Sequence, residues 1–166
     1  MPRSLSIQST TPELLEKILP LIANYQEFYK CTPDTDRNRQ FFSQFIGEDG
    51  PGQPPRQGIQ FVALDEANQA LGFATVYFLP SSLTGGWYCV MNDLLVAPEA
   101  RGQGIGRKLI EHCQSYARAK GFDSVDWMTQ GHNHTAQSLY NQLGADRTDW
   151  FYYSLPTGLE RDTRSV

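Results

Sequence analysis

Hydrophobic residues follow two different periods along this chain, and the change from one period to the other marks the expected elements. Residues 59–64 and 70–79 are apolar, β-branched runs separated by the polar residues 65–69, which predicts a β-hairpin. The apolar run 87–96 stops just before a proline and predicts a further long strand. In all, the expected strands span residues 4–10, 59–64, 70–79, 87–96, 123–129 and 149–155.

Apolar positions recur at helical spacing in four other stretches. The first begins with Thr11 as a suitable N-cap and Pro12 in the first turn, and Pro20 is expected to break or kink it. The second is expected to bury Phe41, Phe42, Phe45 and Ile46. The expected helices span residues 10–29, 34–47, 105–120 and 133–145.

The resulting element order is β-α-α-β-β-β-α-β-α-β. This order predicts an α/β fold in which a mixed central β-sheet carries helices on both faces. Residues 47–58 form a Gly- and Pro-rich stretch typical of a surface loop, and residues 156–166 are expected to be a loose tail. Neither an internal repeat nor a linker is present, so we expect one domain spanning residues 1–166.

Composition supports a folded chain and narrows the function classes. Of its 166 residues, 40% are hydrophobic and 12% aromatic, enough for a substantial core. The net charge of −4 argues against broad binding to nucleic acid, which needs a basic face. No apolar run approaches the roughly 18 residues of a membrane span, and no signal peptide is evident. Cys31, Cys89 and Cys113 are odd in number and far apart, so we expect free thiols in a reducing cytoplasm.

A glycine-rich segment with basic residues joins the strand at 87–96 to the helix at 105–120. It reads RGQGIGRK over residues 101–108. Its spacing excludes both the phosphate-binding P-loop and the dinucleotide fingerprint G-x-G-x-x-G. What remains is a helix N-terminus with unpaired N–H groups and little side chain in front of them, which favours a bound pyrophosphate. The alternative is a tight strand-to-helix turn that binds nothing.

Two motifs in the second half of the chain carry a family resemblance. The segment RGQGIGRKL resembles the acetyl-CoA signature of the GCN5-related N-acetyltransferase (GNAT) family, R/Q-x-x-G-x-G/A, at Arg101, Gly104 and Gly106. The element order is similar to that of this family along nearly the whole chain. The segments YQEFY, MNDLLV and NHTAQSLY are similar to small acetyltransferases of polyamines, of histone tails and, in fungi, of D-amino acids. The second family motif, N-x-x-A-x-x-L-Y-x-x-x-G, is matched by Asn133, Ala136, Leu139, Tyr140 and Gly144.

The resemblance implies an enzyme that moves an acetyl group from acetyl-CoA to a primary amine by direct attack in a ternary complex. Backbone groups of residues 94–96 would pair with the pantetheine arm, and one amide would polarise the thioester carbonyl. The alternative for this stretch is a plain buried strand. Asn133 would lie near the pantetheine and is also a good helix N-cap. The implied acetyl-CoA residues are Leu94, Leu95, Val96, Arg101, Gly102, Gln103, Gly104, Ile105, Gly106, Arg107 and Asn133.

Two residues are candidates for the proton transfers of this reaction. An alkylammonium has a pKa near ~10.4 and must lose a proton before it attacks. Asp93, charged and next to an apolar stretch, is the candidate base; the alternatives are a capping role or binding of the substrate ammonium. The resemblance places Tyr140 where the family has the acid that protonates the departing thiolate. Tyr140 also falls in an apolar helix stripe, which predicts a core aromatic instead.

The acceptor pocket is implied by the resemblance to lie between the first two helices and the open face of the sheet. We expect Glu27, Phe28 and Asn92 to contact the acceptor. Polyamine acetyltransferases of similar sequence tend to carry Glu where this chain has Asn92, which weakens a polyamine assignment. Four nearby residues are either pocket wall or ordinary helix core and surface: Tyr25, Tyr29, Asp34 and Asp36.

Three further expectations concern metal, assembly and competing functions. His132 and His134 flank Asn133, but the cysteines lack C-x-x-C spacing and no further His is close, so no metal is expected. The aromatic run 149–155, with the pairing of related acetyltransferases through this end of the sheet, favours a homodimer. The competing functions are a non-catalytic acyl-CoA-binding module and an acetyltransferase for histone-like protein lysines. The identity of the acceptor amine stays open.

Overall fold

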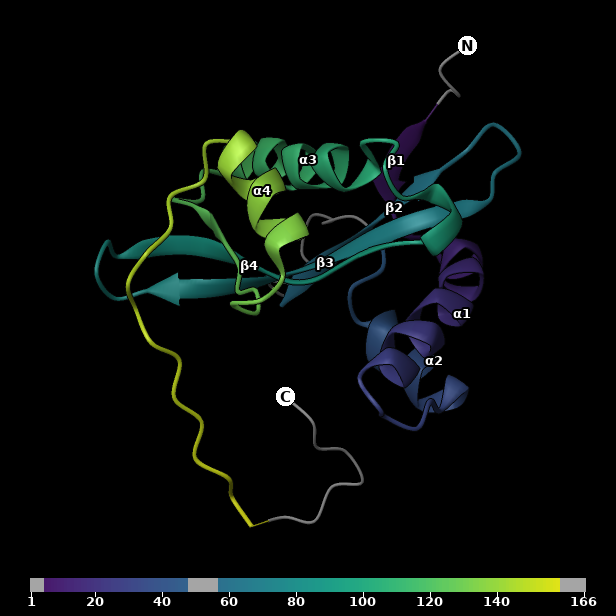
Figure 1. Cartoon of the computed structure of the whole chain (residues 1–166), viewed down its shortest axis with the longest axis horizontal. Helices are drawn as coiled ribbons and strands as arrows, with labels where there is room; N and C mark the ends of the chain where they lie inside the picture. The colour runs from purple at the N-terminus through teal and green to yellow at the C-terminus, as the bar shows by residue number, and fades with distance from the viewer. Residues whose placement is uncertain (1–4, 48–56, 159–166) are drawn as a thin grey trace.

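The computed structural model describes residues 5–47 and 57–158, which form three layers (Figure 1). Helices α3 and α4 cover one face of a central sheet, and α1 and α2 cover the other. Within the described residues the five strands follow the order β1-β2-β3-β4-β5, antiparallel except for the parallel pair β4–β5. The elements are β1 (Ser6–Ser9), α1 (Pro12–Phe28), α2 (Thr35–Ser43), β2 (Gly58–Leu64), β3 (Ala70–Ser81), β4 (Gly86–Val96), a 3₁₀ turn (Pro98–Ala100), α3 (Ile105–Lys120), β5 (Val125–Asp126) and α4 (His134–Gln142).

The inner strand β2 shows why its stretch of sequence is apolar at nearly every position. Ile59, Phe61 and Ala63 pack on the α3 side of the sheet, whereas Val62 and Leu64 pack on the side of α1 and α2. Because helices cover both faces, all seven residues of the strand are buried and its sequence does not alternate. The predicted mixed sheet with helices on both faces is confirmed.

Helix α1 passes through its internal proline without a break. It runs continuously from Pro12 to Phe28, and Pro20 is exposed. Thr11 caps it as predicted, since its side-chain oxygen accepts a hydrogen bond from the N–H of Leu14 at 3.3 Å. Of the expected break or kink at Pro20, the break is therefore wrong, and the kink stays a prediction. A proline removes one backbone hydrogen bond, but buried residues on both sides of Pro20 hold the helix against the sheet.

Helix α2 and the residues after it bury only part of the predicted stripe. Phe42 and Phe45 are 7% and 3% exposed, whereas Phe41 is 44% exposed. The helix ends at Ser43, earlier than predicted, so the helical period does not extend to the last two stripe residues. Phe41 instead lies edge-on to the rings of Phe42 and Phe45, at 5.0 and 5.6 Å between centroids.

The C-terminal part of the chain departs most from the prediction. The expected strand 123–129 is reduced to the two residues of β5, and the expected strand 149–155 does not form. The aromatic run leaves the domain as an extended, exposed segment (Figure 1). A strand requires a hydrogen-bonded neighbour, and among the described residues of one copy none pairs with this segment. The order of helices and strands in the described residues therefore ends with α4.

Two general expectations can be compared with the structure. All three cysteines are free: Cys89 and Cys113 are buried and Cys31 is partly exposed. Burial raises the pKa of the two buried thiols to about 12, so both stay protonated at neutral pH. In the part of the chain that the structure describes, no helix has the length and apolar character needed to cross a bilayer.

Candidate active site

An irregularity in β4 opens the sheet at the centre of the candidate site. Asp93 pairs with Thr75 and Met91 pairs with Val76 on β3, so Asn92 is an extra residue that bulges out of the ladder. On the other edge of β4, β5 pairs only as far as Val90. From Met91 onward no described strand pairs with this edge, so the two parallel strands part here. The backbone of residues 94–96 therefore borders a gap in the sheet, where the sequence analysis expected the pantetheine arm.

The side chain of Asp93 lies at this gap in an environment that is unusual for a carboxylate. Its Oδ1 accepts a hydrogen bond from the Nδ2 of Asn92 at 3.2 Å, and Thr75, its cross-strand partner on β3, places a hydroxyl beside the carboxylate. Its Oδ2 is buried and has no partner among the described residues. Burial raises the pKa of Asp93, while the hydrogen bonds from Thr75 and Asn92 oppose that rise. One oxygen is therefore held in place, and the other is a buried acceptor without a partner among the described residues.

Two tyrosines, Tyr25 on α1 and Tyr77 on β3, lie close enough to this carboxylate for its charge to act on them. The rings of Tyr25 and Tyr29 lie 4.9 Å apart and are edge-on. Burial, followed by the neighbouring Tyr29 and Asp93, raises the pKa of Tyr25 above its usual range. Burial and the charge of Asp93 raise the pKa of Tyr77 to about 12. These phenols stay neutral near pH 7, so they provide hydroxyl groups and ring faces of the kind that bind an ammonium ion.

Tyr140 has the packing expected of a core aromatic and also a polar neighbour. Its ring packs edge-on against Trp127 at 5.1 Å, and it lies partly buried against the α3-side core, as the apolar stripe predicts. Its hydroxyl nevertheless has a polar neighbour in the side chain of Thr129. Burial is the main cause that raises the pKa of Tyr140, with a smaller contribution from Tyr29. The phenol therefore keeps its proton at neutral pH, as a proton donor must.

The glycine segment forms the mouth of α3. Gly102 and Gly104 have φ angles of 75° and 78°, a backbone region that favours glycine, and a Cβ at either would meet no atom within 4 Å. These two glycines thus allow the positive φ angles of the turn and leave open space beside it. Gly104 is the N-cap of α3, and no side chain caps the helix there. The first N–H groups of a 16-residue helix therefore face this space, where an anion is stabilised.

The other residues of the glycine segment are tied into the fold. The Nε of Arg101 donates to the carbonyl of Val96 at 3.2 Å, and the Nη2 of Arg107 donates to the Oε1 of Gln142 at 2.8 Å. The Nε2 of Gln103 donates to the carbonyl of Glu99 at 3.4 Å. These contacts fix the segment between β4 and α4. The side chain of Ile105 belongs to the core, and a Cβ on Gly106 would only touch Leu139 and Val96, both at 3.7 Å.

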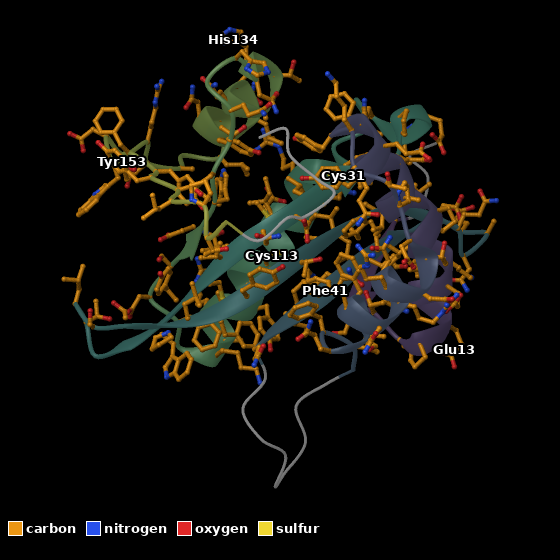
Figure 2. The ribbon with its side chains drawn as sticks, turned by 90° about the horizontal axis from the view of Figure 1, so that it is seen from below. Glu13, Cys31, Phe41, Cys113, His134 and Tyr153 are labelled. Atoms are coloured by element: carbon orange, nitrogen blue, oxygen red, sulfur yellow. The ribbon has the colours of Figure 1, made fainter. Side chains whose placement is uncertain are left out.

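Asn133 is the N-cap of α4, as its sequence position suggests. Its Oδ1 accepts a hydrogen bond from the N–H of Ala136 at 3.2 Å, and its side chain is exposed. His132 and His134 on either side are exposed as well, and Figure 2 shows His134 at the outer edge of the molecule. Among the described residues no group of three His, Cys, Asp or Glu side chains is placed to hold a metal ion.

The predicted substrate residues fall at the end of α1 and on β4. Glu27 and Phe28 are exposed, and the Phe28 ring lies 5.2 Å from that of Tyr29. Asn92 is the bulge residue, exposed and bonded to Asp93. The structure thus places Tyr25 and Asn92 near the Asp93 carboxylate and leaves Glu27 and Phe28 exposed at the end of α1.

The two acidic residues after α1 serve local structure. Asp34 caps α2, since its Oδ1 accepts from the N–H of Arg37 at 2.9 Å. Asp36 forms an ion pair with Arg39 at 2.6 Å. Both carboxylates therefore interact with residues of α2. These contacts favour an ordinary surface role for Asp34 and Asp36 over a role in the wall of the acceptor pocket.

Several residues of the site were not singled out by sequence reasoning. Two of them, Gln60 and Thr75, are polar positions inside otherwise apolar strands, and that interruption was the available signal. The others lie in runs whose aromatic or polar character is common in any sheet or loop. The missed residues are Gln60, Thr75, Tyr77, Trp127 and Thr129.

Comparisons with known proteins identify relatives of this chain. A family model described as "Acetyltransferase (GNAT) family" matches residues 21–145. The D-amino-acid N-acetyltransferase HPA3 of Saccharomyces cerevisiae is 34% identical over 152 residues, which cover 89% of this chain and 88% of that protein. The uncharacterized N-acetyltransferase YhfO of Bacillus subtilis is 30% identical over 139 residues, which cover 83% of this chain and 88% of that protein.

Solved structures give the same result for the fold. The crystal structure of a "probable acetyltransferase" is similar with a TM-score of 0.79 and 29% identity, and covers 93% of this chain and 99% of its own. An aminoglycoside N-acetyltransferase in complex with CoA has a TM-score of 0.77 at 18% identity, covering 95% of this chain and 97% of its own. At 18% identity, the similarity to the aminoglycoside N-acetyltransferase supports the fold alone.

Proposed function

Because this chain belongs to the GNAT family of N-acetyltransferases, we propose that it transfers the acetyl group of acetyl-CoA to a small primary amine by direct attack in a ternary complex. The observation that carries this proposal is the Asp93 carboxylate. It has one oxygen anchored and one without a partner, and it lies where β4 parts from β5. In this proposal residues 1–166 act as one domain, and the free cysteines support a reducing, cytoplasmic location.

The glycine segment and the open edge of β4 fit acetyl-CoA. When bound, this co-substrate supplies an activated acetyl group on a thioester. The α3 N-terminus has free N–H groups, glycines at Gly102 and Gly104 and open space in front of them, and these suit its pyrophosphate. The backbone of Leu94, Leu95 and Val96 would pair with the pantetheine arm, and one of these amides would polarise the thioester carbonyl. Asn133 would contact the pantetheine through the part of its side chain not used by the cap.

Asp93 would bind the acceptor ammonium and take its proton. The unpartnered Oδ2 is the natural acceptor, and the neutral tyrosines around it supply ring faces and hydroxyls for a cation. Only the ionised carboxylate can accept the proton. Burial raises the pKa of Asp93. We therefore expect the activity to fall as the pH is lowered through that raised pKa, because Asp93 becomes protonated.

Tyr140 would return a proton to the departing thiolate. Its phenol remains protonated at neutral pH because burial raises its pKa, and Thr129 orients the hydroxyl. Asn92, Glu27 and Phe28 would contact the acceptor at the entrance. The acceptor class is taken from HPA3, whose name gives D-amino acids as its substrates.

A CoA-release assay tests the proposed reaction. Wild-type protein and acetyl-CoA are supplied with D- and L-amino acids, polyamines, aminoglycosides and a histone-tail peptide, and free thiol is measured with each. We expect release that depends on a small amine. Tight binding of acetyl-CoA with no release from any amine would favour the non-catalytic acyl-CoA-binding module, and release with the peptide alone would favour a protein-lysine acetyltransferase.

We also propose that the protein forms a homodimer through the C-terminal aromatic segment. Trp150, Phe151, Tyr152 and Tyr153 are each more than 70% exposed and lie on an extended segment that leaves the domain. Figure 2 shows Tyr153 at the side of the molecule opposite to Glu13 of α1. A second copy offering the same segment would bury these rings and pair their backbone. Light scattering tests this: we expect a dimer mass that becomes a monomer mass when Trp150 and Phe151 are both replaced by Ser, and a wild-type monomer would contradict it.

A further inference from the structure

A row of polar side chains crosses the sheet beneath α1 and α2. Gln60 on β2 pairs with Thr75 on β3, and Thr75 pairs with Asp93 on β4, so the three residues are direct cross-strand neighbours on one face. Gln60 and Thr75 are both 0% exposed. The next row on the same face consists of apolar residues: Val62, Phe73 and Leu95. The polar row is therefore an interruption in an apolar layer.

The hydrogen bonds along this row have a direction. The Nε2 of Gln60 donates to the Oγ1 of Thr75 at 3.1 Å. A hydroxyl has a single hydrogen, and here its oxygen already accepts from Gln60, so that hydrogen is available for the Asp93 carboxylate. Gln60 thus fixes Thr75 as a donor, and Thr75 fixes the carboxylate.

The row is costly for the fold by itself. Burying polar groups disfavours folding unless their hydrogen bonds are complete, and the Oε1 of Gln60 has no partner among the described residues. Three apolar side chains would pack this layer without that cost. A compensating benefit is thus expected at the one end of the row that reaches the candidate site, which is Asp93.

We propose that Thr75, oriented by Gln60, is a positioning residue that holds the Asp93 carboxylate ionised and turned so that Oδ2 meets the acceptor amine. This inference rests on the proposed role of Asp93. Losing the Thr75 donor removes a hydrogen bond to the charged form, so the pKa of Asp93 rises further and the carboxylate loses its fixed orientation.

The groups around Asp93 do not titrate in the same range. Tyr25 on α1 and Tyr77 on β3 interact with its charge, and Tyr140 on α4 is linked to them through Tyr29. Burial raises the pKa of Tyr25, Tyr77 and Tyr140, so these three are neutral throughout the acidic and neutral range. Asn92, the remaining partner, does not titrate. Glu27, the exposed carboxylate proposed to contact the acceptor, is the same in wild type and in the variants, so a change in the acidic limb between them is attributable to Asp93.

The test compares Thr75→Val, which removes the hydroxyl but keeps the shape, with Thr75→Ser, which keeps the hydroxyl. The first readout is the pH profile of kcat/KM with the best amine. The second is the carboxyl ¹³C titration of Asp93 in the free protein, assigned by its loss in Asp93→Asn. A hydrogen bond to a charged group typically corresponds to about one pKa unit or slightly more, so for Thr75→Val we expect both transitions to move up by roughly one pH unit. Thr75→Ser should titrate like wild type.

Gln60→Met is the second variant, because it removes the amide from the start of the row without touching the carboxylate or Thr75. We expect a shift in the same direction, but smaller than that of Thr75→Val. An Asp93 titration unchanged in both Thr75→Val and Gln60→Met would overturn the inference, and so would Thr75→Ser behaving like Thr75→Val. A failure of the proposed function looks different: wild type would release no CoA with any amine, while the ¹³C titration would still report on the row.

Discussion

The two halves of the candidate site are built in opposite ways. The glycine segment at α3 is one continuous piece of chain that is exposed and offers backbone N–H groups. The Asp93 environment is assembled from α1, β2, β3 and β4, is largely buried, and offers a side-chain carboxylate. The first half would bind its ligand through geometry that any sequence with the right glycines can form. The second depends on which side chains four separate elements bring together.

This difference predicts how each half tolerates change. A backbone site loses affinity when a side chain blocks it or the turn is strained, but its chemistry does not depend on one atom. A buried carboxylate site depends on a single charged group and on the donors that hold it. Substitutions at Asp93 should therefore affect turnover, and substitutions in the glycine segment should affect acetyl-CoA binding. Variants that separate these two effects test the comparison.

The largest effect is expected for Asp93→Asn. Asparagine keeps the shape but cannot accept the proton of the ammonium, so kcat/KM should fall by roughly 10²–10⁴, the usual contribution of acid–base catalysis. The affinity for acetyl-CoA, measured by calorimetry, should stay within a factor of about two. Asp126→Asn, an exposed carboxylate on the neighbouring strand β5, is the matched control and should retain full activity. Wild-type turnover in Asp93→Asn would remove this residue from the mechanism.

A smaller loss is expected for Tyr140→Phe. The substitution keeps the ring against Trp127 and removes the hydroxyl beside Thr129. Since a thiolate is already a fair leaving group, kcat should fall by roughly 10², the low end of the range for general acid catalysis. Tyr116→Phe, a partly buried tyrosine on α3, is the control. If Tyr140→Phe is folded and keeps more than about half of wild-type kcat at saturating amine, its role is packing alone.

The glycine segment is tested by a pair of variants at the two ends of one helix. Gly104 at the start of α3 and Gly121 at its end have φ angles of 78° and 74°, and a Cβ on either meets no atom within 4 Å. Alanine at each should therefore cost similar backbone strain, about 1–2 kcal/mol. Only Gly104→Ala disturbs the N–H groups at the mouth of the helix, so we expect its Kd for acetyl-CoA to rise roughly 10- to 100-fold. Equal acetyl-CoA affinity in both variants would mean that the pyrophosphate binds elsewhere.

The smallest expected effect is on stability and has the opposite sign from the effect on activity. Burial raises the pKa of Asp93, so this residue favours the folded state below its unfolded pKa and disfavours it as the pH rises through the folded pKa. At pH 7 the buried charge therefore lowers the free energy of unfolding. We expect Asp93→Asn to be more stable than wild type at pH 7 in urea unfolding, with a difference that shrinks as the pH is lowered. A difference that grows toward acid pH would mean that the carboxylate stabilises the fold.

The sequence by itself determined the features that lie in one stretch of chain. Helical and strand periods located the main helices and the long strands, because burial against a neighbour imposes a period of 3.6 or 2 on the residues themselves. The glycine segment and the Thr11 and Asn133 caps were readable for the same reason, since each is a local backbone requirement.

Only the tertiary structure decided the features that depend on partners far away in the chain. Pro20 stayed inside α1 because packing outweighed a local rule, and residues 149–155 did not form a strand because no described edge lies beside them. The row Gln60–Thr75–Asp93 exists only through the register of three strands and the bulge at Asn92, which no period in the sequence reveals. Its three members are separated by 15 and 18 residues, and only strand pairing places their side chains next to one another.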